Sequence, residues 1–368
     1  MAGRPRAREI DCVRPVEIPD KFPNVDTKGG AATIALVQHD PAARRAEGGA
    51  LSTAPIRIGV STCLLGERVR FDGGHKRDAF LVETFGRFVE WVPVCPEVEM
   101  GLPVPRDTLR LVRDEDGGLR LVMPKTGADY TIRMRRYAAV RCAALRREDL
   151  CGYVLKKNSP SCGLERVKVY TEKGTPSAAG RGLFAETLLR AFPHLPIEEE
   201  GRLSDPRLRE NFIERVFAYR RLRSLFSARW RLGDLVAFHT THKLQLLAHL
   251  PAGYERLGRL VARAKGMPRE RLRGDYESGF METLAVLATP RRHSNVLHHI
   301  VGYFRKQLDR ASRKETLDLI DDYRRGLVPL VVPLTIVRHH VTRLNVSYLR
   351  GQHYLDPHPK ELMLRNHV

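Results

Sequence analysis

The chain has 368 residues, enough for two domains of ordinary size, and its formal net charge is +20 at pH 7. Hydrophobic residues make up 42% of the chain, but no run approaches the ~18 uninterrupted apolar residues of a membrane span, so we expect a soluble, cytoplasmic protein. The excess of positive charge is typical of proteins that bind polyanions.

The first 53 residues have the composition of a flexible leader. They hold eight Lys or Arg and seven Asp or Glu, with many Ala and Gly and no sustained apolar periodicity. They lack the apolar segment of a signal peptide, and their acidic residues argue against an organellar transit peptide. We therefore expect residues 1–53 to be flexible, and Cys12, within this polar segment, carries little information about function.

The next part of the chain has the pattern of an α/β domain. From Ile56 to about Pro196, apolar strand-like runs alternate with helical stretches, which favours βαβ units and a largely parallel sheet. Residues 109–112 and 119–123 flank a charged, glycine-containing turn and predict an inserted hairpin. We place this α/β domain at residues 54–203.

Two helices of this domain bear on the search for a site. An amphipathic helix is expected over residues 132–150, with Cys142 and Cys151 packing in it or at its end. A pair of glycines, Gly180 and Gly182, precedes a later helix. Such a pair can cradle an anion at a helix N-terminus, but the packing of a tight turn is the favoured interpretation.

Three further cysteines each follow an apolar, strand-like run: Cys63, Cys95 and Cys162. In open α/β sheets the ligand crevice lies outside the carboxyl ends of the strands, so loops far apart in sequence can meet there. The alternative is that these cysteines only fill the core, since free cysteine is often buried. The glycine, proline and charged residues that follow them argue instead for a converging metal site.

The spacing of the cysteines narrows the kind of metal site. No C-x-x-C pair occurs in the chain, which disfavours a zinc ribbon or a thioredoxin-type redox motif. Protein-bound iron–sulfur clusters usually take four cysteine ligands, so a set of three would leave one iron open to solvent or substrate. We therefore expect an iron–sulfur cluster whose open iron acts as a Lewis acid.

The motifs around these cysteines carry a family resemblance. They are VSTCLLG at residues 60–66, PVCPEVEMGLP at residues 93–103 and SPSCG at residues 159–163. In this order, over about residues 55–200, they resemble the thiouracil desulfidase (TudS) family. The resemblance implies a Rossmann-like α/β fold that holds a 4Fe-4S cluster through three cysteines, with a thiolated pyrimidine binding the fourth iron through its sulfur. The implied ligands are Cys63, Cys95 and Cys162.

Members of this family also use a glutamate and a serine near the cluster, and the matching positions here are Glu97 and Ser159. Glu99 is close enough in sequence to compete for the role of the glutamate. Hydrolysis of a thiocarbonyl needs an activated water, and a carboxylate within hydrogen-bond reach can take a proton from it or relay one to the ring. The Ser159 hydroxyl can contact substrate or water, or it can simply be a turn residue before Pro160.

Residues 204–368 are predicted to form a basic, all-helical, RNA-binding domain. Ser204-Asp205-Pro206 has an N-cap candidate followed by proline at the first helical position. From residue 201 onward the chain holds 31 Lys plus Arg against 16 Asp plus Glu, and 11 of its 14 histidines. Basic helices attract phosphate backbones through counterion release. The segments with helical periodicity are 232–250, 254–264, 276–287, 296–308 and 316–327.

The histidines of this domain suggest a second metal site only weakly. His239 and His242 lie one helical turn apart, but the zincin pattern H-E-x-x-H needs a glutamate that does not follow His239. RNA contact or a network within the helices is the favoured interpretation. The same holds for His298, His299, His339 and His340.

The helical half resembles the YbgA-like domain over roughly residues 206–345, with residues 238–243 and 348–352 as the recognisable segments. The fusion as a whole resembles the RudS type of tRNA 4-thiouridine desulfidase, which implies that the helical domain presents tRNA to the cluster. We therefore expect conversion of 4-thiouridine in tRNA to uridine, with release of sulfide and no net redox change. The alternatives are desulfidation of free thiouracil and an RNA-binding protein with structural zinc.

Overall fold

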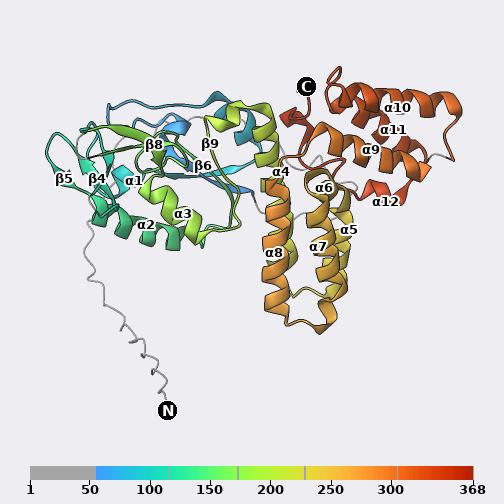
Figure 1. Ribbon diagram of the computed structural model, residues 1–368, viewed down its shortest axis with the longest axis horizontal. Helices are drawn as coiled ribbons and strands as arrows, with labels where there is room; N and C mark the ends of the chain where they lie inside the picture. The colour runs from blue at the N-terminus through green and yellow to red at the C-terminus, as the bar shows by residue number, and fades with distance from the viewer. Residues whose placement is uncertain (1–54, 115, 172–173, 228, 305, 368) are drawn as a thin grey trace, which may run out of the picture. The chain divides into compact units, whose positions relative to one another are not determined.

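The computed structural model describes residues 55–114, 116–171, 174–227, 229–304 and 306–367 (Figure 1). The predicted leader, residues 1–53 with Cys12, lies outside the described residues. Everything described falls in one of the two units into which the chain divides, Gly48–Val368.

The α/β part is organised around a four-stranded parallel sheet in the order β2-β1-β6-β9. Its strands are β1 (Arg57–Ser61), β2 (Glu90–Val94), β6 (Leu150–Leu155) and β9 (Ile197–Glu199). All six residues of β6 are buried, as is typical of an inner strand whose two faces are both covered. The predicted parallel α/β fold is confirmed.

The two faces of this sheet are covered by different helices. Successive side chains of a strand point to opposite faces. The ring of Tyr153 lies 6.2 Å from that of Phe184 in α3 (Leu183–Ala191), and α3 packs beside α2 (Thr131–Leu145). On the other face, a Cβ at Gly152 would lie 2.8 Å from a methyl carbon of Val216 in α4 (Pro206–Ser227). The domain boundary that we predict at residue 204 therefore falls between elements that share one core.

The prediction of a helix over residues 132–150 is wrong at the C-terminal end, where the helix stops earlier than expected. Helix α2 ends at Leu145, a turn follows, and Asp149 adopts a φ of 51°, which breaks the helix before β6 begins. Cys151 therefore lies in a strand rather than at the end of a helix, whereas Cys142 lies in α2. Both side chains are buried in the core, as expected for packing residues.

A second sheet has five strands in the order β5-β4-β3-β7-β8. The predicted hairpin is confirmed, since β3 (Arg110–Arg113) pairs antiparallel with β4 (Leu119–Met123). The sheet was not predicted as a whole, because β3 also pairs in parallel with a strand far along the chain. The remaining strands are β5 (Ala128–Asp129), β7 (Val167–Tyr170) and β8 (Pro176–Gly180).

From α4 onward the described chain is mostly helical, as predicted (Figure 1). The Asp205 carboxylate accepts hydrogen bonds from the amides of Arg207 and Leu208, so it caps α4. The segment predicted as one helix, 232–250, is two, because the buried His242 has a φ of −99° and a ψ of 0°. The helices after α4 are α5 (Leu232–Thr241), α6 (Lys243–His249), α7 (Pro251–Ala262), α8 (Arg269–Ala285), α9 (Pro290–Phe304), α10 (Arg310–Arg324), α11 (Val331–Arg343) and α12 (Ser347–Arg350).

No helix among the described residues is long and apolar enough to cross a membrane.

Candidate active site

The loops that follow β1, β2 and β6 meet around one cavity of about 450 Å³. Cys63 lies in the 3-10 turn η2 (Thr62–Leu65) directly after β1. Cys95 precedes the short helix α1 (Pro96–Glu99), which follows β2, and Cys162 lies in the loop after β6. The structure thus brings the three predicted cysteines to the walls of one cavity, together with Glu97 and Ser159.

The Cys162 loop is held by a serine and a glycine. The Ser159 hydroxyl oxygen accepts hydrogen bonds from the amides of Ser161, at 3.2 Å, and Cys162, at 3.1 Å. On its other side the loop packs on Gly182, where a Cβ would lie 2.3 Å from the Ser161 carbonyl oxygen. The glycine pair before α3 therefore serves the tight packing that we favoured, and Ser159 shapes the loop that carries the third thiol.

Burial favours the protonated form of all three thiols. It raises the pKa of Cys63 to about 11, with Cys95 adding to the effect, and it also raises the pKa of Cys95. Burial raises the pKa of Cys162 well above its usual value, and a hydrogen bond with Ser61 only partly opposes this. A bound metal cation would lower the pKa of these thiols, because a thiol that coordinates a metal ion is deprotonated.

The arrangement of donors fits a group larger than one ion. Among the described residues, no three His, Cys, Asp or Glu side chains are placed to hold a single metal ion. Three thiols on the walls of a 450 Å³ cavity can instead contact different atoms of a larger group. Such a donor set matches the thiolate ligation of an iron–sulfur cluster.

Glu97 is the carboxylate that lines this cavity. Its Oε2 accepts hydrogen bonds from Arg106 Nε at 3.0 Å and Nη2 at 2.7 Å, and its Oε1 accepts one from the Ser161 hydroxyl at 2.9 Å. The side chain of Arg106 is only 4% exposed. These contacts fix the position of the carboxylate, because a two-point contact with a guanidinium restricts both distance and angle.

The competing carboxylate, Glu99, is occupied elsewhere and does not line the cavity. Its Oε1 accepts a hydrogen bond from the Cys95 amide at 2.9 Å, and its Oε2 accepts one from the Tyr137 hydroxyl at 2.7 Å. An ion pair with Arg141 at 3.1 Å completes its contacts. Glu99 therefore supports the loop after β2, whereas Glu97 faces the cavity.

Several residues that line the cavity or hold its carboxylate were not found from the sequence. Ser161 lies inside a motif that we singled out, but nothing in the motif shows which of its serines contacts the carboxylate. Arg106 has no local signal at all, because the fold alone brings it to Glu97. The same holds for the other basic side chains that line the cavity, which are Arg70, Lys76, Lys156 and Lys157.

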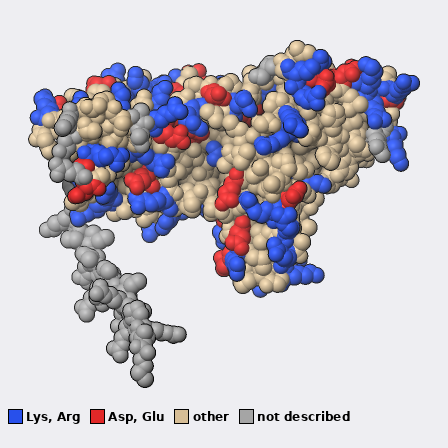
Figure 2. Space-filling view, in the orientation of Figure 1, with Lys and Arg blue, Asp and Glu red and all other residues tan. Residues whose placement is uncertain are grey.

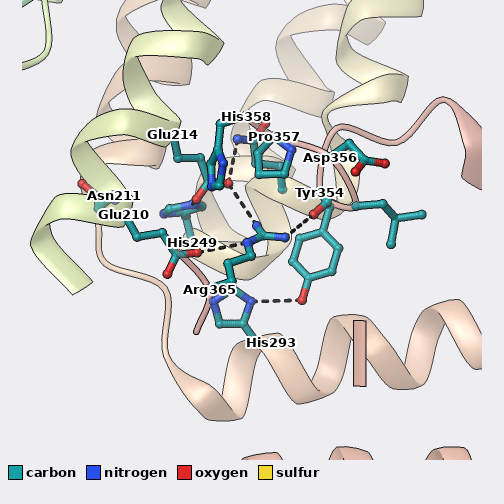
Figure 3. A network of polar contacts seen from close by, with 12 residues as sticks. Glu210, Asn211, Glu214, His249, His293, Tyr354, Asp356, Pro357, His358 and Arg365 are labelled. Carbon is teal, nitrogen blue, oxygen red and sulfur yellow. Dashed lines mark hydrogen bonds and ion pairs between the residues drawn. The ribbon is translucent and has the colours of Figure 1, made fainter. Parts of the chain in front are cut away.

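A second cluster of buried charged groups lies in the helical part (Figure 3). Arg365 donates through Nε to Glu210 at 3.0 Å and through Nη1 to the Tyr354 carbonyl at 2.7 Å, and its Nη2 lies 3.7 Å from Glu214. Glu214 also lies 3.5 Å from His249. The adjoining cavity of about 60 Å³ has room for about two waters. The cluster thus anchors the C-terminal segment to α4 and offers no room for a nucleobase.

The histidines that suggested a metal site contact other side chains instead. His239 Nδ1 lies 3.1 Å from the Tyr276 hydroxyl, and its ring stacks on Tyr254. His242 Nε2 accepts a hydrogen bond from Arg221 at 3.2 Å. His340 contacts Thr316 at 3.2 Å. The exposed members of the predicted set are His298, His299 and His339.

A parallel sheet with a thiol-lined cavity at its carboxyl edge, continued by a helical part, defines an α/β protein with a thiol-based ligand site. Residues 58–200 match the 2-thiouracil desulfurase family, and residues 243–359 match a domain family of unknown function, DUF1722. Over 164 residues the chain is 34% identical to the uncharacterized protein YbgA of Escherichia coli (strain K12), which covers 44% of this chain and 95% of that protein. The chain therefore belongs to the YbgA family through its helical part and carries a 2-thiouracil desulfurase domain in its α/β part.

Two further proteins are similar to parts of this chain. The uncharacterized protein YbbK of Bacillus subtilis (strain 168) is 29% identical over 139 residues, which are 36% of this chain and 89% of that protein. Among solved structures, the 4Fe-4S-dependent thiouracil desulfidase TudS is 30% identical, with a TM-score of 0.34, and covers 41% of this chain and 94% of that one.

Proposed function

We propose that this protein removes sulfur from 4-thiouridine in tRNA, through an iron–sulfur cluster held by Cys63, Cys95 and Cys162. The reaction exchanges the C4=S group and water for C4=O and hydrogen sulfide, so no electrons are gained or lost. The observation that carries the proposal is the cavity, where three thiols and one carboxylate meet inside a 2-thiouracil desulfurase domain. The chemistry supplied by a cluster with an open iron is Lewis-acid polarisation of a thiocarbonyl sulfur.

Glu97 is the residue that we assign to proton transfer. Its carboxylate lines the cavity, where it can take a proton from the attacking water and return one to the leaving sulfur. Arg106 and Ser161 hold both of its oxygens, so the group stays at one place during the reaction.

We assign Ser159 two roles, holding the Cys162 loop and donating a hydrogen bond to the substrate. Its oxygen already accepts two amide hydrogen bonds, while its single hydroxyl proton can still be donated into the cavity that it lines. Loss of this side chain should therefore disturb the Cys162 loop as well as any contact with the substrate.

Charge favours tRNA over a free base as the substrate. The basic residues on the cavity walls outnumber its carboxylate, and within the described part of the chain neither the Lys76 nor the Lys157 side chain has an ion-pair partner. A neutral thiouracil has no charge to pair with these ammonium groups, whereas the phosphates that flank a nucleoside in RNA are negatively charged. The helical part, with 31 Lys plus Arg against 16 Asp plus Glu, adds to the same attraction. Figure 2 shows Lys and Arg gathered over the lower end of α7 and α8.

The runner-up is desulfidation of free thiouracil by the same cavity, which the name of the matching family favours. Anaerobic reconstitution with iron and sulfide, followed by a visible spectrum and parallel assays on thiolated tRNA and thiouracil, distinguishes these functions. We expect cluster absorbance and sulfide release from both substrates, with tRNA preferred. Sulfide from thiouracil alone would establish the runner-up, and zinc without iron or sulfide would instead indicate an RNA-binding protein with a structural metal.

A further inference from the structure

A basic hollow of about 800 Å³ lies where the C-terminal end of α4 meets the N-terminal end of α8. One carboxylate, Glu270, lines it beside a set of arginines and aromatic rings. We name this set the arginine–tryptophan surface and define it by Phe226, Arg229, Trp230, Arg231, Arg269 and Arg273.

Two of the arginines are stacked on the aromatic rings. The guanidinium carbon of Arg269 lies 4.9 Å from the centre of the Trp230 ring, and that of Arg273 lies 5.5 Å from the centre of the Phe226 ring. The two rings are themselves in contact, edge to face, at 5.2 Å. A guanidinium held over a ring by a cation–π contact keeps its N–H donors available for two-point contact with phosphate.

Four arginines and only one carboxylate, Glu270, line this hollow, so its positive charge is not fully neutralised within the described residues. None of its arginines forms an ion pair there, although Arg271, on the same helix, pairs with Asp275 at 3.7 Å. Grouping unpaired like charges around one hollow is unfavourable in the free protein. An anionic partner with closely spaced charges would relieve that repulsion.

The side chains of this surface fit a nucleic acid better than a membrane. An interfacial membrane contact inserts exposed apolar side chains. Here Phe226 is only 5% exposed, and Arg269 stacks on Trp230. The groups that face outward are guanidinium donors, and their chemistry matches a phosphodiester backbone.

We infer that the arginine–tryptophan surface binds the phosphate backbone of the RNA substrate. The inference rests on the proposed function and adds to it the place where the helical part holds the RNA. This surface is separate from the thiol-lined cavity, since the two share no lining residue. It should therefore set affinity for tRNA without affecting the chemistry on a free base.

The test uses the full-length, cluster-loaded protein and compares Arg269→Ala/Arg273→Ala with the matched control Arg271→Ala. The control removes one positive charge from the same helix, from a residue that already has a carboxylate partner, so its slope is compared with half of the change in the double variant. Binding of tRNA is measured over a range of salt concentrations, and sulfide release from free thiouracil is measured for each variant. A second readout is Trp230 fluorescence in a Trp91→Phe background, since the chain has two tryptophans.

We expect the double variant to make the plot of log affinity against log salt shallower by about 1.4 to 1.8, which is the loss of two contacts at about 0.7 to 0.9 each. Arg271→Ala should leave that slope unchanged, all variants should turn over thiouracil normally, and tRNA should quench Trp230. An unchanged slope in the double variant, an equal change per charge removed in Arg271→Ala, or unquenched Trp230 with bound tRNA would overturn this inference and leave the proposed function standing. A wild-type protein that acts on thiouracil but neither binds nor desulfidates tRNA would overturn both.

Discussion

Replacing Glu97 with glutamine removes one charge from the candidate active site and keeps the shape of the side chain. Because a general acid or base contributes about 100- to 10,000-fold, we expect turnover of thiolated tRNA and of thiouracil to fall by that factor. In free energy this is about 3 to 5.5 kcal/mol of lost transition-state stabilisation.

The same substitution also has a structural cost that must be separated from the chemical one. Arg106 is 4% exposed and makes two hydrogen bonds to one oxygen of Glu97. Removing one partner of a buried pair costs about 3 to 5 kcal/mol, and this is an upper value here because the amide oxygen of glutamine can still accept from Arg106. Chemical denaturation measures this loss, and iron content and visible absorbance show whether the cluster is kept.

Glu99→Gln is the matched control. Glu99 accepts hydrogen bonds from the Cys95 amide and Tyr137 and pairs with Arg141, but it does not line the cavity. We expect a smaller loss of stability than for Glu97→Gln, because the Glu99 side chain is 34% exposed, and turnover within about tenfold of wild type, since proton transfer is not its role. Full turnover in a cluster-loaded Glu97→Gln protein, or a larger loss of turnover in Glu99→Gln, would refute the assignment of the carboxylate.

Single serine substitutions at Cys63, Cys95 and Cys162 should each abolish iron loading, whereas Cys142→Ser should retain it. Metal analysis after anaerobic reconstitution measures the iron content, and near-normal iron in any of the first three variants would contradict the ligand set. Gly182→Ala should also reduce iron loading, because its Cβ would lie 2.3 Å from the Ser161 carbonyl oxygen and displace the Cys162 loop, and a fully loaded variant would show that the loop tolerates movement. Arg365→Met should lower the free energy of unfolding by about 3 to 5 kcal/mol, because it leaves the carboxylates of Glu210 and Glu214 buried without a guanidinium partner. An unchanged midpoint of urea denaturation would show that Arg365 does not anchor the C-terminal segment. Acidification should destabilise the fold from about pH 6.5 downward. Burial lowers the pKa of His239 to about 4 and the pKa values of His293 and His353 to about 3. These rings therefore stay neutral in the folded protein and take up protons when it unfolds, which favours the unfolded state as the pH falls. Burial raises the pKa of Glu210 to about 7 and also raises that of Glu199, so these two carboxyl groups oppose the effect of the histidines. Stability that rises between pH 6.5 and 5 in urea titrations would contradict the prediction.

The parallel sheet and its cysteine loops could be predicted because both depend on local patterns. Buried inner strands appear as continuous apolar runs, and loops at the carboxyl ends of parallel strands share one edge whatever their separation in sequence. This is why Cys63, Cys95 and Cys162 were expected to meet. The choice between Glu97 and Glu99 could not be made in the same way, since both lie in one helical turn and only the fold directs Glu97 to the cavity.

Features that depend on distant pairing escaped prediction. The parallel partner of β3 is β7, and no local pattern in either strand specifies the other. The break at His242 interrupts a segment whose helical periodicity is otherwise continuous. Helix α4 was assigned to the helical domain by its N-cap, yet its Val216 packs on Gly152 of the sheet. Local signals marked where this helix begins but carried no information about what it covers.

The order of strands in the sheet has a consequence for when the thiol-lined cavity comes into existence during synthesis. β6 pairs with β1 on one side and β9 on the other, so the sheet is complete only after residue 199 has left the ribosome. Pairing strands this far apart in sequence costs loop-closure entropy before the favourable contacts between the strands form, so such sheets fold slowly. Cys63 and Cys95 are therefore made well before the third thiol that completes their site. The three thiols therefore face one cavity only in a finished α/β fold.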